Sequence, residues 1–162
     1  MNKTKILFVC MGNICRSPTA HAVMQHKIDE LGLSDQYKVE SAGTHGYHIG
    51  EKSDERSRAL AREKGVDMEY VRSQKISIND YDYYDYILAM DRDNLELIEY
   101  YSPPNPKAEI ALFLSFATQL EQTNRDEVPD PYYGGAQGFE DVFQLVEIGC
   151  DAIIQTLHQT SN

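Results

Sequence analysis

The residues with the clearest chemical potential lie near the N-terminus, where five residues separate Cys10 from Arg16. A thiolate at Cys10 would act as a nucleophile, and the guanidinium of Arg16 can bind two oxygens of an anion such as phosphate. The intervening residues let the backbone turn once, so that successive N–H groups converge on one electropositive spot. Thiols ionise more readily at helix N-termini and beside cations, so this spot favours the thiolate of Cys10. The segment therefore predicts a nucleophilic cysteine within a phosphate-binding loop.

The residues of this loop are the expected phosphate ligands. Their backbone N–H groups would bind the oxygens, and they are Met11, Gly12, Asn13, Ile14, Cys15 and Arg16. Gly12 and Asn13 tolerate the left-handed backbone angles that a phosphate-binding loop requires. Ser17 follows the loop directly, and its hydroxyl can donate a hydrogen bond to the thiolate of Cys10.

The elements on either side of the loop must hold it in place. The apolar run Ile6-Leu7-Phe8-Val9 predicts a strand before it, and Ser17 with Pro18 predicts a capped helix start after it. The helical pattern continues to about Leu31. The face expected to pack against the sheet consists of Ala20, Val23, Met24, Lys27 and Leu31.

Strand and helix patterns alternate along the rest of the chain. Further strands are expected at residues 37–41, 86–90 and 109–114, and further helices at residues 53–64, 91–101 and 139–158. This alternation predicts right-handed crossovers and a parallel sheet with helices on both faces. Ligands of such sheets bind beyond the carboxyl ends of the strands, where Cys10 lies. We therefore expect an α/β fold, a single domain over residues 1–162 with a four-stranded parallel sheet and the phosphate-binding loop after its first strand.

The net charge and the cysteine count narrow the class of protein. The formal charge of −11 argues against nucleic acid and anionic membranes as partners. The chain has three cysteines, an odd number that fits a reducing compartment better than a disulfide framework. The apolar runs are shorter than a signal peptide or a membrane span, so we expect a cytoplasmic protein. Nothing in the sequence indicates the oligomeric state.

Four segments of the chain resemble those of the low-molecular-weight protein tyrosine phosphatases. They are residues 9–18, 41–44, 86–94 and 130–133, and they occur in the same order as in that family. The resemblance extends through most of the chain. It implies a four-stranded parallel sheet, no metal or other cofactor, and tyrosine-phosphorylated proteins as partners. It also implies hydrolysis of phosphotyrosine, an aryl phosphate monoester, through a phosphocysteine intermediate.

The resemblance assigns roles to residues far from the loop. Asp130 takes the position of a general acid that protonates the leaving group and then activates water, whereas in isolation its Asp-Pro pair is typical of a turn. Because tyrosine has a pKa near ~10, a positioned acid is expected to accelerate the reaction roughly 10²–10⁴-fold. Tyr47 and Tyr132 correspond to rings that sandwich the substrate, and Tyr133 to a neighbouring wall or a modification site. Each of these three tyrosines is alternatively an ordinary half-buried residue.

The resemblance also bears on loop support and specificity. It implies that Asn13 fixes the loop backbone through Ser41, while from the residues alone Asn13 is equally a simple turn residue. Ile14 favours phosphotyrosine, because related arginine phosphatases carry a threonine at that position. The chain departs from the family pattern at residues 70–74, where many members have a histidine followed by an arginine pair and only Arg72 is comparable.

Several alternatives stay open. A protein arginine phosphatase or an arsenate reductase of the same fold would use a similar loop, but such reductases relay oxidation through a further cysteine pair, and residues 81–91 contain none. A non-catalytic module that binds phosphotyrosine would be expected to lack the nucleophile or the acid, and Cys10 and Asp130 are both present. Cys15 is either a partner that traps oxidised Cys10 as a disulfide or a small packing residue.

Overall fold

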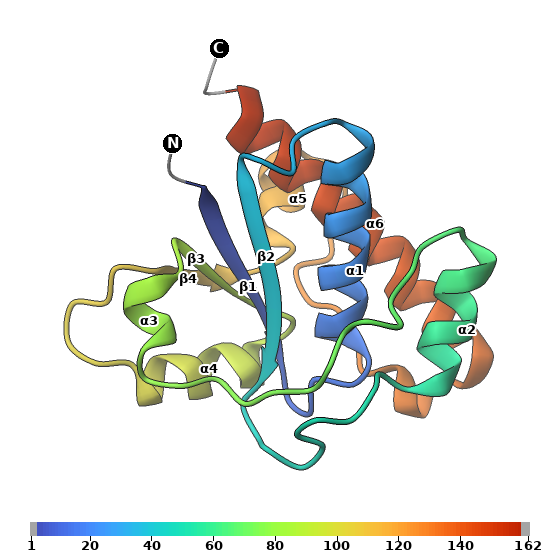
Figure 1. Cartoon of the computed structure of the whole chain (residues 1–162), viewed down its shortest axis with the longest axis horizontal. Helices are drawn as coiled ribbons and strands as arrows, with labels where there is room; N and C mark the ends of the chain where they lie inside the picture. Colours follow the sequence, from blue (N-terminus) through green and yellow to red (C-terminus); the bar gives the residue numbers. More distant parts are fainter. Residues whose placement is uncertain (1–2, 160–162) are drawn as a thin grey trace.

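The computed structural model of the protein describes residues 3–159, except for the side chains of Tyr133 and Gln159. These residues form a four-stranded parallel sheet in the order β2-β1-β3-β4 (Figure 1). The strands are β1 Thr4–Cys10, β2 Tyr37–Gly43, β3 Tyr86–Ala89 and β4 Glu109–Leu112. The predicted α/β fold with a four-stranded parallel sheet is confirmed, and the loop that follows β1 starts at its carboxyl end.

Helices cover both faces of this sheet (Figure 1). One face carries α1 Arg16–Glu30, α5 Ser115–Gln119 and α6 Gly135–Gln159, and the other carries α3 Asp80–Tyr83 and α4 Arg92–Tyr101. The remaining helix, α2 Glu55–Glu63, packs beside α6. None of the helices within residues 3–159 is long and apolar enough to cross a membrane.

The central strand β1 is buried on both faces. Ile6 and Phe8 belong to the apolar core under α1 and α6, and Leu7 and Val9 belong to the core under α3 and α4. Successive residues of a strand point to opposite faces, so a strand covered on both sides reads as a continuous apolar run. This double burial fixes the position of Cys10, the last residue of the strand.

The start of α1 differs from the prediction. The helix begins at Arg16, its N-cap residue is Cys15, and no side chain caps it, so the prediction that Ser17 caps the helix is wrong. The hydroxyl of Ser17 is directed to the phosphate-binding loop instead. The predicted apolar face is also wrong at Leu31, which follows the last helical turn and is 59% exposed.

The segment that contains Asp130 is joined closely to the last helix. A short 3₁₀ helix, η1 Pro131–Tyr133, follows Asp130, and α6 begins at Gly135, four residues before its predicted start at Phe139. A side chain at Gly138 would place its Cβ 2.9 Å from the carbonyl oxygen of Pro131, so only glycine permits this contact. Glycine is typical of turns and breaks a helical pattern, so no local signal in the sequence marks the first turn of α6.

Candidate active site

The loop after β1 turns its carbonyl groups outward, and neighbouring segments hold them there. The hydrogen bonds are Thr44 N to Cys10 O (2.9 Å), His45 N to Met11 O (3.0 Å), Asp54 N to Ile14 O (2.8 Å) and Ser73 Oγ to Gly12 O (3.1 Å). Within the described residues 3–159, none of the backbone hydrogen bonds of loops and turns has its donor among the N–H groups of residues 12–15. A loop whose carbonyls are hydrogen-bonded outward and whose N–H groups stay unpaired can bind an anion through those N–H groups.

Asn13 holds the loop in shape. Its backbone adopts a left-handed conformation with φ of 57°, as the sequence predicts. Its side-chain Nδ2 donates to Ser17 Oγ at 2.8 Å, and its Oδ1 accepts from the N–H of Gln74 at 2.9 Å. The same Ser17 Oγ lies 2.9 Å from Cys10 Sγ. A thiolate carries no hydrogen, so when Cys10 is ionised the hydroxyl of Ser17 is the donor and stabilises the charge.

The end of β2 packs so closely against the loop that it requires glycine. A Cβ at Gly43 would lie 2.7 Å from the carbonyl oxygen of Met11 and 2.9 Å from that of His45. Backbone atoms on both sides leave no flexible neighbour that can give way. The resemblance of residues 41–44 to the phosphatase family thus has a steric basis.

Behind the loop, a buried histidine supports the same network. His21 Nδ1 lies 3.0 Å from Ser41 Oγ, and the His21 ring meets Tyr70 edge to face at a centroid distance of 5.6 Å. His21 is only 6% exposed, and burial lowers its pKa from 6.5 to about 4, so the ring is neutral at pH 7. The predicted link from Asn13 to Ser41 runs through Gln74, whose Nε2 donates to the Ser41 carbonyl at 2.9 Å.

Arg16 is buried, and two hydrogen-bond acceptors fix its guanidinium beside the cavity. Its Nη1 donates to Asp91 Oδ2 at 2.6 Å and to the carbonyl of Val128 at 3.0 Å. Asp91 also accepts from the N–H of Asn94 and so caps α4. Burial alone would lower the pKa of Arg16, but the negative charges of Cys10 and Asp91 outweigh it and raise the pKa overall. The guanidinium therefore stays charged, and its orientation is set before any ligand binds.

These elements enclose a cavity of about 160 Å³ over the loop. It is lined by Cys10, Met11, Gly12, Ile14, Cys15, Arg16, Tyr47, His48, Asp130 and Tyr132. The structure thus brings Asp130 and two of the predicted tyrosines to Cys10 and Arg16 from distant parts of the chain. Asn13, Ser17 and Ser41 are buried beneath the loop, and the side chain of Tyr133 lies outside the described part of the chain.

The rim of the cavity is formed by two exposed aromatic rings. Tyr47 stacks on His45 at a centroid distance of 5.1 Å. The guanidinium of Arg56 lies over the ring of Tyr132, 5.6 Å from the ring centroid, in a cation–π contact. The backbone N–H of Tyr132 donates a hydrogen bond to Asp130 Oδ1 at 2.9 Å. This bond from the backbone N–H of Tyr132 caps η1 and fixes the carboxylate of Asp130 at the start of that turn.

Four residues at or beside the site were not predicted from the sequence. His48 lines the cavity and its Nδ1 lies 2.9 Å from Glu51 Oε2. Arg56, Gln74 and His21 act through tertiary contacts that join α2, α1 and the loop near residue 74. The departure from the family pattern at residues 70–74 was a signal for two of these contacts, because Tyr70 and Gln74 both fall within it.

The three cysteines are free thiols in very different surroundings. Burial raises the pKa of Cys15 to about 12, and the negative charges of Asp54 and Cys10 add to the effect. Cys150 is fully buried in the apolar core, and burial raises the pKa of its thiol as well. Cys15 lines the cavity with Cys10, whereas Cys150 packs against α1.

Comparisons with known proteins agree with this geometry. A family model described as "Low molecular weight phosphotyrosine protein phosphatase" matches residues 5–162. The protein YfkJ of Bacillus subtilis, a low molecular weight protein-tyrosine-phosphatase, is 34% identical over 154 residues, which cover 95% of this chain and 96% of that protein. The crystal structure of YfkJ has a TM-score of 0.91 at 33% identity, with coverage of 100% of this chain and 99% of that one.

Two further solved structures are similar over nearly their whole length. A protein tyrosine phosphatase from Entamoeba histolytica, with Hepes in the active site, has a TM-score of 0.90 at 38% identity and covers 99% of this chain and 100% of that one. A Drosophila arginine phosphatase has a TM-score of 0.85 at 31% identity and covers 94% and 97% of the two chains. From the family match and these relatives, the chain belongs to the low-molecular-weight phosphotyrosine protein phosphatase family, as its four sequence segments predicted.

Proposed function

We propose that this chain hydrolyses phosphotyrosine in proteins through a phosphocysteine intermediate. The observation that carries the proposal is the cavity itself, which gathers the Cys10 thiol, the Arg16 guanidinium and the Asp130 carboxyl between the rings of Tyr47 and Tyr132. A nucleophile, a cation and an acid in one aromatic-walled pocket are the groups that cleavage of an aryl phosphate needs.

In the first step the Cys10 thiolate attacks phosphorus and forms an S–P bond. The bond between phosphorus and the tyrosine oxygen breaks, and its electron pair stays on that oxygen, which takes a proton from the carboxyl of Asp130. The free N–H groups of residues 12–15 and the guanidinium of Arg16 bind the three non-bridging oxygens, whose charge they stabilise during the transfer.

In the second step Asp130, now a carboxylate, takes a proton from a water molecule that attacks phosphorus. The S–P bond breaks, phosphate leaves, and the electron pair returns to Cys10 as a thiolate. The hydroxyl of Ser17, 2.9 Å from the sulfur, stabilises this leaving group in the second step and the nucleophile in the first.

The walls of the pocket favour an aromatic phosphate. An aryl ring fits between Tyr47 and Tyr132 and can reach a thiol that lies at the buried base of the cavity. Ile14 lines the same cavity and supports phosphotyrosine over phosphoarginine. The partners proposed are therefore tyrosine-phosphorylated proteins, and a reducing compartment such as the cytoplasm would keep Cys10 as a thiol.

The roles of Cys10 and Asp130 are tested by their variants. Cys10→Ser should abolish turnover of phosphotyrosine and retain binding of inorganic phosphate, because the loop that binds the oxygens is intact. Asp130→Asn keeps the acceptor for the Tyr132 N–H but not the proton, so it should slow phosphotyrosine by about 10²- to 10³-fold and nitrophenyl phosphate, a better leaving group, far less. Asp29→Asn, an exposed carboxylate on α1, serves as the control.

The outcomes separate the candidate functions. Equal losses on both substrates would remove Asp130 from the acid role, and turnover by Cys10→Ser would exclude the nucleophile assignment. A higher kcat/KM on phosphoarginine than on phosphotyrosine would favour the arginine phosphatase alternative. Reduction of arsenate in the presence of a thiol would favour the reductase.

A further inference from the structure

The negative charge of the chain is unevenly distributed. Residues 51–72 contain six basic and six acidic side chains, so the whole formal charge of −11 lies outside this segment. The segment includes α2 and the turn after it, and it lies next in sequence to Tyr47 and His48 at the rim of the cavity. Residues 73–162 contain four basic and 16 acidic side chains, so an acidic partner is repelled less by residues 51–72 than by this later part of the chain.

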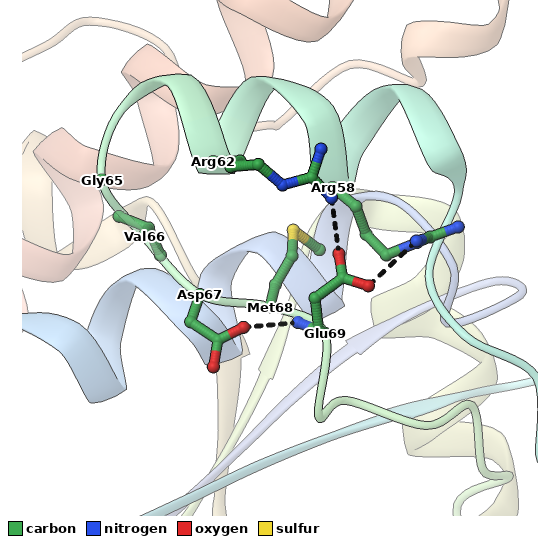
Figure 2. Close-up of a pocket in the computed structure, with 7 residues that line it drawn as sticks. All are labelled: Arg58, Arg62, Gly65, Val66, Asp67, Met68 and Glu69. Atoms are coloured by element: carbon green, nitrogen blue, oxygen red, sulfur yellow. Dashed lines mark hydrogen bonds and ion pairs between the residues drawn. The ribbon is translucent and has the colours of Figure 1, made fainter.

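Within the segment, basic side chains gather around one carboxylate. Figure 2 shows the carboxylate of Glu69 between the side chains of Arg58 and Arg62 on α2. Arg58 lies 3.0 Å and Arg62 3.3 Å from Glu69, and Lys52 Nζ approaches the same carboxylate at 3.6 Å. These three cations and Arg72 are called the basic cluster below.

The cluster carries more positive charge than its internal acid can balance. Arg72 donates to the backbone carbonyls of Glu69 and Val71, which are neutral, so its charge adds to that of the other three cations. Asp67 bonds the N–H of Glu69 and supplies a second carboxylate nearby. Four cations face two carboxylates, and the cluster is positive in a strongly acidic protein.

The cluster is also open to a ligand. Arg58 and Arg62 border a cavity of about 290 Å³, whose other walls are residues 65–69 (Figure 2). The side chain of Arg62 is 68% exposed and that of Lys52 is 51% exposed. The ion pairs with Glu69 show that these cations bind carboxylates, and the exposed parts of Arg62 and Lys52 leave room for a carboxylate from a partner.

Backbone hydrogen bonds join the cluster to the active site. Lys52 and Arg72 form an antiparallel bridge, and beside it Ser73 donates its N–H to Glu51 and its hydroxyl to Gly12 of the phosphate-binding loop. Lys52 lies five positions after Tyr47 in the sequence, a distance of about 18 Å at most in extended chain. An extended peptide whose phosphotyrosine enters the cavity beside Tyr47 would reach Lys52, one member of the cluster, within about five residues.

We propose that the basic cluster is a docking site for acidic side chains that lie three to five residues from the phosphotyrosine of a protein substrate. The proposal rests on the proposed function and adds a preference for the flanking sequence. Exposed ion pairs are individually weak, so two acidic residues should raise kcat/KM about 3- to 10-fold at low ionic strength. The preference should fade in high salt, because these charges are screened within about 8 Å at physiological ionic strength.

The test compares phosphotyrosine peptides that differ in two residues, placed four and five positions before or after the phosphotyrosine. The pairs are Glu-Glu, Ala-Ala and Lys-Lys, and free phosphotyrosine is the reference substrate for each enzyme. Wild type should prefer the Glu-Glu peptide on one side of the phosphotyrosine. The double variant Lys52→Gln/Arg62→Gln should lose that preference, and Arg62→Glu should shift it toward the Lys-Lys peptide.

A matched control separates local docking from net charge. Lys3→Gln/Lys107→Gln removes the same total charge from exposed sites outside the segment and should keep the Glu-Glu preference. No preference in wild type, or an equal preference in the Lys52/Arg62 variant, would overturn the proposal. Binding of the same peptides to Cys10→Ser, followed by fluorescence anisotropy, measures docking without turnover, so a failure of phosphatase activity on free phosphotyrosine is distinguished from a failure of docking.

Discussion

Acidification should destabilise the protein through the buried ring of His21. Burial disfavours the charged imidazolium and lowers the pKa of His21 to about 4 in the folded chain, from the ordinary value of 6.5 that we expect in the unfolded chain. Between these pH values the unfolded chain binds a proton that the folded chain does not. The stability that His21 contributes is therefore fully present above pH 6.5 and is lost as the pH falls toward 4.

The size of the effect follows from the two pKa values. At pH 5 the unfolded histidine is largely protonated, at about 1.5 pH units below its ordinary pKa, while the folded ring is still mostly neutral. Each pH unit corresponds to about 1.4 kcal/mol, so the unfolding free energy should fall by about 2 kcal/mol between pH 8 and pH 5 from this residue. That is a large part of the 5–15 kcal/mol that is typical of a domain.

The assay is urea unfolding of wild type and His21→Gln at pH 8, 7, 6 and 5. Glutamine does not titrate, and its amide can still bond Ser41, so the variant should lose about 1 kcal/mol at pH 8 from poorer contact with Tyr70. Between pH 8 and pH 5 the unfolding free energy of the variant should therefore decrease by about 2 kcal/mol less than that of wild type.

A second histidine on the same helix provides the control. His26→Gln removes a partly exposed ring, and in this variant the fall of about 2 kcal/mol that His21 causes between pH 8 and pH 5 should persist. Parallel pH profiles for wild type and His21→Gln would refute the burial of a neutral ring at this position. Because Ser41 and Gln74 connect His21 to Asn13, the same protonation should also lower the affinity of the loop for phosphate at pH 5.

Two further predictions concern the loop and its second thiol. Gly43→Ala should weaken competitive inhibition by phosphate about 10-fold or more and lower the melting temperature, because a Cβ would lie 2.7 Å from the Met11 carbonyl; wild-type phosphate affinity in this variant would contradict the steric account. After peroxide treatment, wild type should regain activity with dithiothreitol through a Cys10–Cys15 disulfide, and Cys15→Ser should not. The pKa of Cys15 is about 12 and the thiolate is the attacking form, so the rate of disulfide closure, measured by mass spectrometry, should increase as the pH rises from 7 to 9. Equal recovery of activity in wild type and Cys15→Ser would show that Cys15 is only a packing residue.

The phosphate-binding loop was predictable because its information is contiguous in the sequence. An apolar strand, a left-handed position at Asn13 and a helix start follow one another within a few residues, and each depends on local backbone preference. Ser17 shows the limit of such preference. Serine at this position is typical of a helix cap, but the Ser17 hydroxyl forms hydrogen bonds with Cys10 and Asn13 instead. These bonds exist only in the folded loop, so the local sequence does not predict them.

The distant parts of the site depend on tertiary packing. Asp130 belongs to an Asp-Pro pair that is typical of an ordinary turn. Only the family resemblance predicted that it lies near the phosphate-binding loop, because no local pattern shows where the start of α6 will pack. Arg56 and His48 carry no motif at all, and their places follow from how α2 and the segment before it pack on the loop. The short helices α3 and α5 span too few turns for apolar periodicity to be recognised.

The charges around the cavity do not by themselves favour a dianion. Arg16 is positive, but it lies beside Cys10 and the carboxylate of Asp91, and Asp130 also lines the cavity. The remaining attraction for a phosphate dianion must then come from the loop N–H groups. Their dipoles are oriented before the substrate binds, so binding requires no reorganisation of the loop. The N–H of Thr44 and the hydroxyl of Ser73 bond the carbonyls of Cys10 and Gly12, so these residues support phosphate binding although neither lines the cavity. A site built from peptide dipoles acts only at short range, and in an acidic chain the longer-range attraction of a substrate falls to cations outside the cavity, where the basic cluster lies.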